Sequence, residues 1–188
     1  MFFNVPTLLT WGRIIAIPLV VGVFYLGLDQ ETQNVTATVL FVLVALTDWA
    51  DGYLARRLKM TSSFGAFLDP VADKFLVCAA LLVLVELGRL HALVALIIIG
   101  REIAISALRE WMAQIGAARS VAVSMIGKVK TVVQMVAIPF LLFHGALFGV
   151  IDTQWWGTLL IYASAVLTIW SMIYYLRKAL PEIRAKAR

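Results

Sequence analysis

The sequence contains little charge and only one cysteine. Charged residues make up 14% of the 188 positions, hydrophobic residues make up 62%, and the mean hydropathy is +0.94. Average soluble domains are about 25% charged and roughly 45–50% apolar, so the composition excludes an ordinary water-soluble globular protein. The high hydrophobicity also excludes a disordered chain, and the single Cys78 excludes an internal disulfide. We therefore expect an integral membrane protein.

Uncharged runs in the sequence predict where the chain crosses the membrane. A transmembrane helix needs about 20 apolar residues. Two runs reach that length without a charge, at residues 131–151 and 153–176, and four shorter runs reach it only by taking in charged residues, at 14–28, 35–47, 75–85 and 90–100. The first span has no basic leader, which favours a retained helix over a signal peptide. We predict an all-α integral membrane protein, a bundle of six transmembrane helices forming one domain over residues 1–188.

The positive charges predict the orientation of these helices. Lysine and arginine gather after the second span, after the fourth span and in the C-terminal tail, whereas the opposite side has Arg89 alone. This asymmetry predicts that both termini and the basic segments lie in the cytosol. Anionic lipid headgroups account for the basic residues, because these flank the membrane, so we expect no nucleic-acid partner.

Four aspartates lie at the cytosolic ends of the second and third predicted spans. Asp48 and Asp51 share one face of a helix, and Asp69 and Asp73 are one turn apart on the next. Carboxylates gathered at one level of a membrane bundle repel one another unless a cation holds them. Two helices that each offer two carboxylates suit a hard divalent cation such as Mg²⁺, with phosphate oxygens of a substrate completing the coordination.

Residues beside these aspartates have two possible roles. Gly52 and Ala55 lie on the same face as the first acidic pair, where their small size leaves space for a flat ring or a sugar, or else allows close helix packing. Asp69 precedes Pro70, so it is alternatively the N-cap of a helix that begins there. Arg56 is alternatively a membrane anchor on the inner face.

The spacing of these residues resembles the signature of a known family. Between Asp48 and Asp73 the chain has Asp-x-x-Asp-Gly-x-x-Ala-Arg, eight further residues, and Gly-x-x-x-Asp-x-x-x-Asp, which matches the CDP-alcohol phosphotransferases throughout. Other stretches resemble the bacterial branch of the family that makes phosphatidylglycerophosphate, and these are residues 4–13, 64–74, 101–111 and 127–131. The resemblance thus runs nearly from end to end.

This resemblance implies a reaction and a set of site residues. It implies a homodimer in the bacterial inner membrane with an active site facing the cytosol, which joins CDP-diacylglycerol to sn-glycerol 3-phosphate with two Mg²⁺ or Mn²⁺ ions. Asp48, Asp51 and Asp69 would be metal ligands, and Asp73 would be a ligand and the general base. The residues expected to bind CDP-diacylglycerol are Gly52, Ala55, Arg56 and Gly65, with Asn4 and Thr10 at the start of the first span.

The acceptor is a phosphate ester, so its site needs cations. Candidates on the cytosolic side are Arg109, Arg119, Lys128 and Lys130, with Arg101 and Arg177 as possible helpers, although the positive-inside rule alone also explains each of them. Glu102 shares a helical stripe with Arg109 and is expected to orient it. Lys128 and Lys130 would be about 200° apart on a helix, so both face one ligand only if Lys128 lies in a loop.

Two other functions are compatible with acids in a helical bundle. A cation-coupled transporter would place them near the midplane, often on broken helices in repeated halves, whereas these acids lie at one membrane face and the two halves show no matching pattern. A sister transferase that uses inositol phosphate, serine or another alcohol would carry the same signature, because the signature concerns the CDP-lipid half of the reaction.

Overall fold

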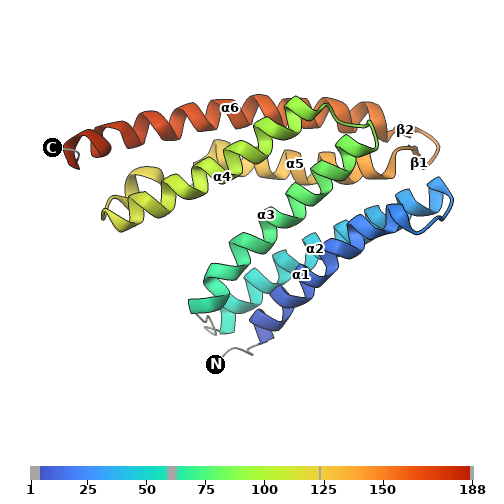
Figure 1. Ribbon diagram of the computed structural model, residues 1–188, viewed down its shortest axis with the longest axis horizontal. Coiled ribbons are helices and arrows are strands. Elements are labelled where there is room, and N and C mark those ends of the chain that lie inside the picture. Colours follow the sequence, from blue (N-terminus) through green and yellow to red (C-terminus); the bar gives the residue numbers. More distant parts are fainter. Residues whose placement is uncertain (1–4, 59–62, 123, 187–188) are drawn as a thin grey trace. The chain divides into compact units, whose positions relative to one another are not determined.

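The chain is almost entirely helical. The computed structural model describes residues 5–58, 63–122 and 124–186, but not the side chains of residues 5–10, 48–58, 63–67, 69, 118–119 and 185–186. The α-helices within these ranges are α1 (Val5–Gly22), α2 (Gln30–Leu58), α3 (Ser63–Glu86), α4 (Ala92–Gln114), α5 (Met125–Phe143) and α6 (Thr153–Lys186) (Figure 1). Shorter elements are the 3-10 helices η1 (Val23–Tyr25) and η2 (Ala118–Val121) and the strands β1 (Ala146–Leu147) and β2 (Ile151–Asp152).

These elements divide into two compact units. Unit 1 comprises residues 1–89 and 139–154, and unit 2 comprises residues 90–138 and 155–188. In unit 1, α1 packs against both α2 and α3 (Figure 1), and buried apolar side chains such as Val20, Phe41 and Leu76 form its core. In unit 2, a buried cluster joins α4 to α6 and η2 through Ile105, Val121 and Tyr175.

Polar side chains complete two helix ends in unit 1. Asp29 precedes α2, and its carboxylate accepts hydrogen bonds from the backbone N–H of Thr32 at 2.9 Å and from the Thr32 hydroxyl at 2.8 Å. These hydrogen bonds hold the pKa of Asp29 below its ordinary value.

Arg89 completes the other end. It donates to the carbonyl oxygens of Leu141 and Leu142 at 3.2 and 2.8 Å, and to Oδ1 of Asn34 at 2.7 Å. Its guanidinium therefore satisfies carbonyls in the last turn of α5, where a cation is also favoured by the helix dipole. Burial lowers the pKa of Arg89.

The fifth predicted span has the wrong boundaries. Residues 131–151 were expected to be helical, whereas α5 starts at Met125, ends at Phe143 and is followed by the antiparallel hairpin β1–β2. His144 and Gly149 have positive φ values of 49° and 72°, which a helix does not allow. A search for uncharged residues misses this turn because residues 144–151 are uncharged, and it misses the start of α5 because two lysines lie in its first turns.

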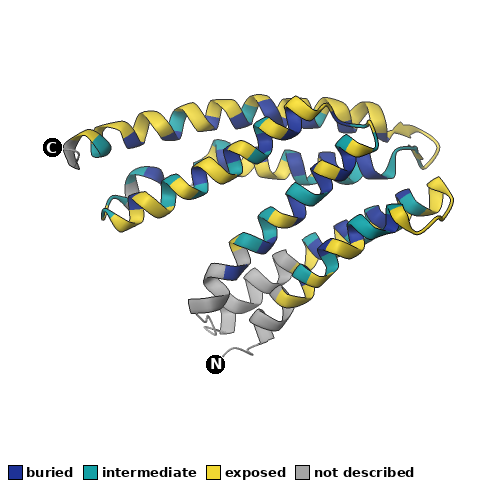
Figure 2. Cartoon of the chain, viewed as in Figure 1, coloured by how far each residue is buried: buried dark blue, intermediate teal, exposed yellow. Residues whose placement is uncertain are grey.

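The apolar surface indicates a membrane protein. Among the described residues, α5 and the segment Thr153–Arg184 of α6 are long and apolar enough to cross a bilayer, with mean hydropathies of 1.6 and 1.7. Exposed positions run along the helices (Figure 2). Large apolar side chains are among them, including Leu96 and Ile103 on α4 and Val166 and Trp170 on α6. Soluble proteins rarely expose so much apolar surface.

Candidate functional site

The four signature aspartates lie on two helices of unit 1. Asp48 and Asp51 are in the last third of α2, and Asp69 and Asp73 are one turn apart in α3. Because α3 begins at Ser63, Asp69 lies inside a continuous helix, and the alternative in which it is an N-cap is wrong. Each helix therefore carries two of the four signature aspartates, as the sequence predicted.

The chemistry of these positions fits a divalent cation. Asp73 is half-buried, and hard cations prefer carboxylate oxygens of this kind. No group of three His, Cys, Asp or Glu side chains forms among the side chains that the structure describes. The structure does not describe the side chains of the other residues predicted to bind the metal ions or CDP-diacylglycerol. Asn4 lies outside the described residues, and the remaining ones are Thr10, Asp48, Asp51, Gly52, Ala55, Arg56, Gly65 and Asp69.

Unit 1 also buries the cation at the entry to the first predicted span, which was a candidate for a headgroup contact. Arg13 on α1 is only 3% exposed, although the sequence placed it at the start of a span, where an arginine usually extends to the headgroups. A buried charge is costly in free energy unless its surroundings compensate it. Arg13 thus belongs to the interior of the unit that carries the acidic positions.

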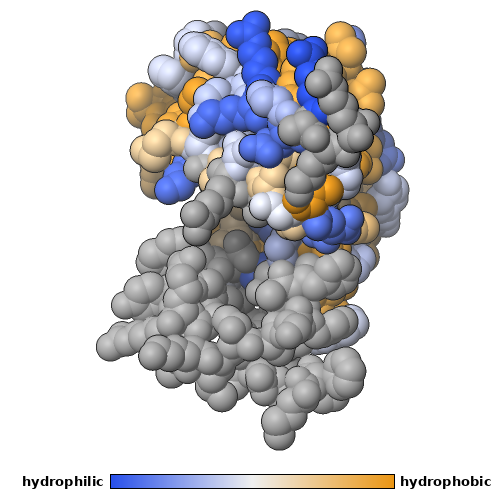
Figure 3. Space-filling view, turned by 90° about the vertical axis from the view of Figure 1, so that its left-hand side faces the viewer, coloured by the Kyte–Doolittle hydropathy of each residue, from blue (hydrophilic) through white to orange (hydrophobic). Residues whose placement is uncertain are grey.

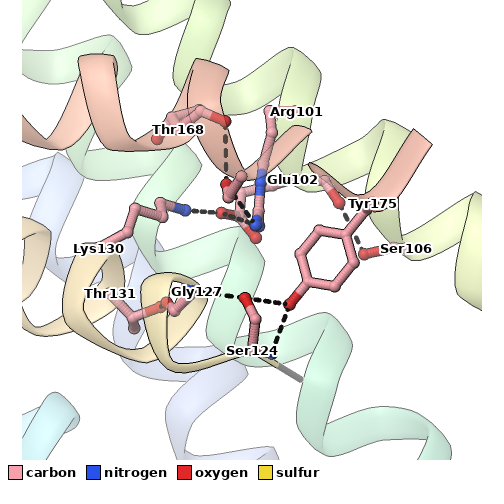
Figure 4. A network of polar contacts seen from close by, with 10 residues as sticks. Arg101, Glu102, Ser106, Ser124, Gly127, Lys130, Thr131, Thr168 and Tyr175 are labelled. Carbon is pink, nitrogen blue, oxygen red and sulfur yellow. Dashed lines mark hydrogen bonds and ion pairs between the residues drawn. The ribbon is translucent and has the colours of Figure 1, made fainter. Parts of the chain in front are cut away.

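A network of ionic side chains lies inside unit 2. Glu102 on α4 accepts from the ammonium group of Lys130 on α5 and from Nη1 of Arg101 at 3.4 Å (Figure 4). Lys130 is 2% exposed and Arg101 is 7% exposed. Nη2 of Arg101 donates to the Ser171 hydroxyl on α6 at 2.9 Å, so the network joins three helices.

The predicted acceptor cations separate into two groups. The first group belongs to the interior of unit 2: Arg101 and Lys130 are buried, and Arg109 is half-buried. The second group, Lys128 and Arg177, is exposed. The side chain of Arg119 is not described. Lys128 and Lys130 both lie in α5, so they do not share a face. Hydrophilic side chains gather at the end of unit 2 that Figure 3 shows.

The partner expected for Glu102 is wrong. Helical spacing suggested that Glu102 orients Arg109, but in the structure it pairs with Lys130, which is 28 positions away, and with Arg101. Arg109 instead lies over the ring of Tyr175, with its guanidinium carbon 5.1 Å from the ring centre. A cation above an aromatic ring is attracted by the ring's negative face.

Tyr175 is the main residue of this region that the sequence analysis missed. It is fully buried, and its hydroxyl bonds to Ser124 just before α5 (Figure 4). It belongs to no motif, and the signal that remains in the sequence is helical spacing with Ser171, one turn earlier on the same face of α6.

Comparison with known proteins identifies the family. Residues 3–173 match the CDP-alcohol phosphatidyltransferase family. The chain is 49% identical to a CDP-diacylglycerol–glycerol-3-phosphate 3-phosphatidyltransferase of Salmonella choleraesuis (strain SC-B67), with 95% of this chain and 96% of the relative covered. It is 48% identical to the protein of the same name from Escherichia coli (strain K12), with 97% and 98% covered. On the signature of α2 and α3 and on these matches, the chain belongs to the CDP-alcohol phosphatidyltransferase family.

Proposed function

We propose that this protein transfers the phosphatidyl group from CDP-diacylglycerol to sn-glycerol 3-phosphate, with phosphatidylglycerophosphate and CMP as products. The observation that carries the proposal is the 48–49% identity, over almost the whole chain, to relatives that bear the name of this reaction. The signature from Asp48 to Asp73 supports the CDP-lipid half of the reaction, and the cations of unit 2 support a phosphorylated acceptor.

The acidic positions of unit 1 would serve the nucleotide half. Asp48, Asp51, Asp69 and Asp73 would hold two divalent ions, Mg²⁺ or Mn²⁺. When bound, these ions would neutralise charge on the diphosphate and polarise the phosphorus that carries the lipid oxygen. The residues that would hold CDP-diacylglycerol are Gly52, Ala55, Arg56, Gly65, Asn4 and Thr10.

The chemical step is a substitution at phosphorus. The glycerol hydroxyl oxygen forms a bond to the phosphorus attached to diacylglycerol, and the bond from that phosphorus to the bridging diphosphate oxygen breaks. CMP leaves with the bridging oxygen, and Asp73 accepts the hydroxyl proton. A carboxylate beside cations is a weak base, so its contribution comes from its position next to the hydroxyl.

The network of unit 2 would bind the acceptor phosphate. Arg101, Arg109 and Lys130 contribute three positive charges and Glu102 one negative charge, which leaves a net charge of about +2. A phosphate monoester carries about −1.5 to −2 near pH 7, so the two charges match. Arg119 remains a candidate, whereas exposed Lys128 and Arg177 are weaker ones because no hydrogen bond or ion pair to another described residue holds them toward the network.

The same proposal includes the membrane arrangement. The chain would form a single domain with six transmembrane helices, in the bacterial inner membrane, with both termini and the active site on the cytosolic side, and it would act as a homodimer among membrane lipids. In unit 2 most basic residues lie toward the C-terminal ends of α4 and α6, in η2 or at the N-terminal end of α5, as the positive-inside rule requires of a cytosolic side, whereas Arg101 lies near the middle of α4.

A panel of acceptors tests the reaction. Purified protein would be incubated with CDP-diacylglycerol and glycerol 3-phosphate, inositol phosphate or serine, and CMP release would be measured with and without Mg²⁺ or Mn²⁺. We expect release with glycerol 3-phosphate and a divalent ion. A clear preference for another acceptor would assign the protein to a sister activity within the family.

A further inference from the structure

Tyr175 connects the start of α5 to α6. Its hydroxyl accepts from the backbone N–H of Ser124 at 2.7 Å and donates to the Ser124 hydroxyl oxygen at 3.0 Å. That oxygen also accepts from the backbone N–H of Gly127 at 3.2 Å, so Ser124 acts as the N-cap of α5. One phenolic group therefore fixes the first turn of the helix that carries Lys130 less than two turns later (Figure 4).

The ring of Tyr175 supports two cations of α4. The guanidinium carbons of Arg101 and Arg109 lie 5.8 and 5.1 Å from the ring centre. Nε of each arginine is buried without a hydrogen-bond partner among the described residues. The ring therefore adds to what holds Arg109, and for Arg101 it adds to the contacts with Glu102 and Ser171. Free arginine and lysine side chains lose rotamer entropy when a ligand fixes them, and a preformed arrangement avoids that loss.

Gly127 shows how closely this region is packed. A Cβ atom added at Gly127 would lie 3.2 Å from the Tyr175 hydroxyl oxygen and 3.6 Å from the Ser124 hydroxyl oxygen. The first of these contacts is tighter than ordinary van der Waals contact, so a larger residue would displace the phenol. The absence of a side chain at this position allows the hydroxyl to reach the start of α5.

We propose that Tyr175 is a positioning residue for the acceptor site. Its hydroxyl sets the position of α5 and therefore of Lys130, and its ring holds Arg101 and Arg109, so that the acceptor phosphate meets cations that are already in place. The inference rests on the proposed function, because it assigns these three cations to glycerol 3-phosphate. Tyr175 itself would not touch the reacting atoms.

Replacement of the hydroxyl alone tests this role. Tyr175→Phe keeps the ring and removes two hydrogen bonds, and Tyr174→Phe is a matched control because no hydrogen bond of the Tyr174 hydroxyl occurs among the described residues. We expect Tyr175→Phe to raise the KM for glycerol 3-phosphate about tenfold, with the KM for CDP-diacylglycerol changed less than about twofold. Tyr174→Phe should leave both values within about twofold of wild type.

A double-mutant cycle separates positioning from general stability. If the two hydroxyls act as one unit, Ser124→Ala and Tyr175→Phe together should raise the acceptor KM no more than the larger single effect. Gly127→Ala should shift the acceptor KM in the same direction. Equal losses for both substrates, strictly additive effects, or a Tyr175→Phe enzyme indistinguishable from Tyr174→Phe would overturn the inference.

Binding of inorganic phosphate provides a readout that does not require turnover. Calorimetric titration of the purified proteins should show weaker phosphate binding for Tyr175→Phe than for Tyr174→Phe, and equal binding would count against the role of Tyr175. A wild-type protein that binds phosphate but releases no CMP with glycerol 3-phosphate would instead overturn the proposed function, so the two failures are distinguishable.

Discussion

Acidic residues outnumber basic ones in unit 1, whereas basic residues outnumber acidic ones in unit 2. The residues expected to take part in the chemistry are also distributed differently along the chain in the two units. The four signature aspartates of unit 1 all fall within residues 48–73, on two successive helices. The network of unit 2 brings together Arg101 and Glu102 of α4, Lys130 of α5 and Ser171 of α6. Residues that lie close together in the sequence form a recognisable motif. Residues that are far apart in the sequence and meet only when the helices pack do not.

The largest expected effect lies in unit 1. Asp73→Asn keeps the size of the side chain but removes the proton acceptor and one metal-ligand charge, so CMP release should fall by at least about 100-fold. The measurement is single-turnover CMP release, with size-exclusion elution and thermal unfolding as controls for folding. Near-normal turnover would refute the assignment of Asp73 as the general base.

Metal removal tests the acidic positions as a group. Exhaustive chelation should reduce CMP release to background, and added Mg²⁺ or Mn²⁺ should restore it, because two carboxylate pairs without cations repel one another and cannot hold a diphosphate. Phosphate binding to unit 2, measured by calorimetry, should persist after chelation. Full activity in the chelated protein would contradict the metal assignment.

The two lysines of α5 test the cationic network. Lys130→Met should raise the acceptor KM roughly 10- to 100-fold and lower the free energy of unfolding by about 2 kcal/mol, because it leaves the partly buried Glu102 beside a single cation. The exposed Lys128→Met should have a much smaller effect on both quantities.

A second substitution separates the two effects of Lys130. Glu102→Gln combined with Lys130→Met should recover much of the lost stability, since the partly buried carboxylate charge is removed, but it should not recover acceptor affinity. Recovery of both would mean that Lys130 has a structural role only. Equal effects of Lys128 and Lys130 would contradict the orientation of α5.

Arg89 tests whether the opposite end of unit 1 is structural. Arg89→Met removes hydrogen bonds to two carbonyls of α5 and to Asn34, so the free energy of unfolding should fall by about 2 kcal/mol. Both KM values should remain as in wild type, because the expected chemistry is on the other membrane side. A selective change in one KM would show that this end influences a substrate site.

The smallest effect concerns Asp29, which caps α2. Its folded-state pKa is lowered by hydrogen bonds from Thr32, so its stabilisation is present above the carboxyl's ordinary pKa and is lost as the pH falls through the lowered folded value. Asp29→Ala should slightly lower Tm at neutral pH and remove this part of the acid dependence. An unchanged Tm profile between pH 2 and 5 would show that the cap contributes nothing measurable.

The sequence predicted the helical elements better than their ends. All six predicted spans overlap α-helices of the structure, because long apolar runs are a strong signal. The limits of α5 were wrong, since a buried lysine that pairs with a carboxylate can lie within a helix and an uncharged run can contain a hairpin. The N-cap alternative for Asp69 was wrong because α3 continues through Pro70.

The amino-acid sequence by itself determined the membrane character, the family and the acidic pairs of α2 and α3, because composition and helical periodicity are local properties. Only the tertiary structure decided that Glu102 pairs with Lys130, that Lys128 stays exposed, and that Tyr175 bonds to Ser124. These contacts join residues 28 and 51 positions apart. Helix packing sets such distances, and the spacing of residues along the chain does not encode them.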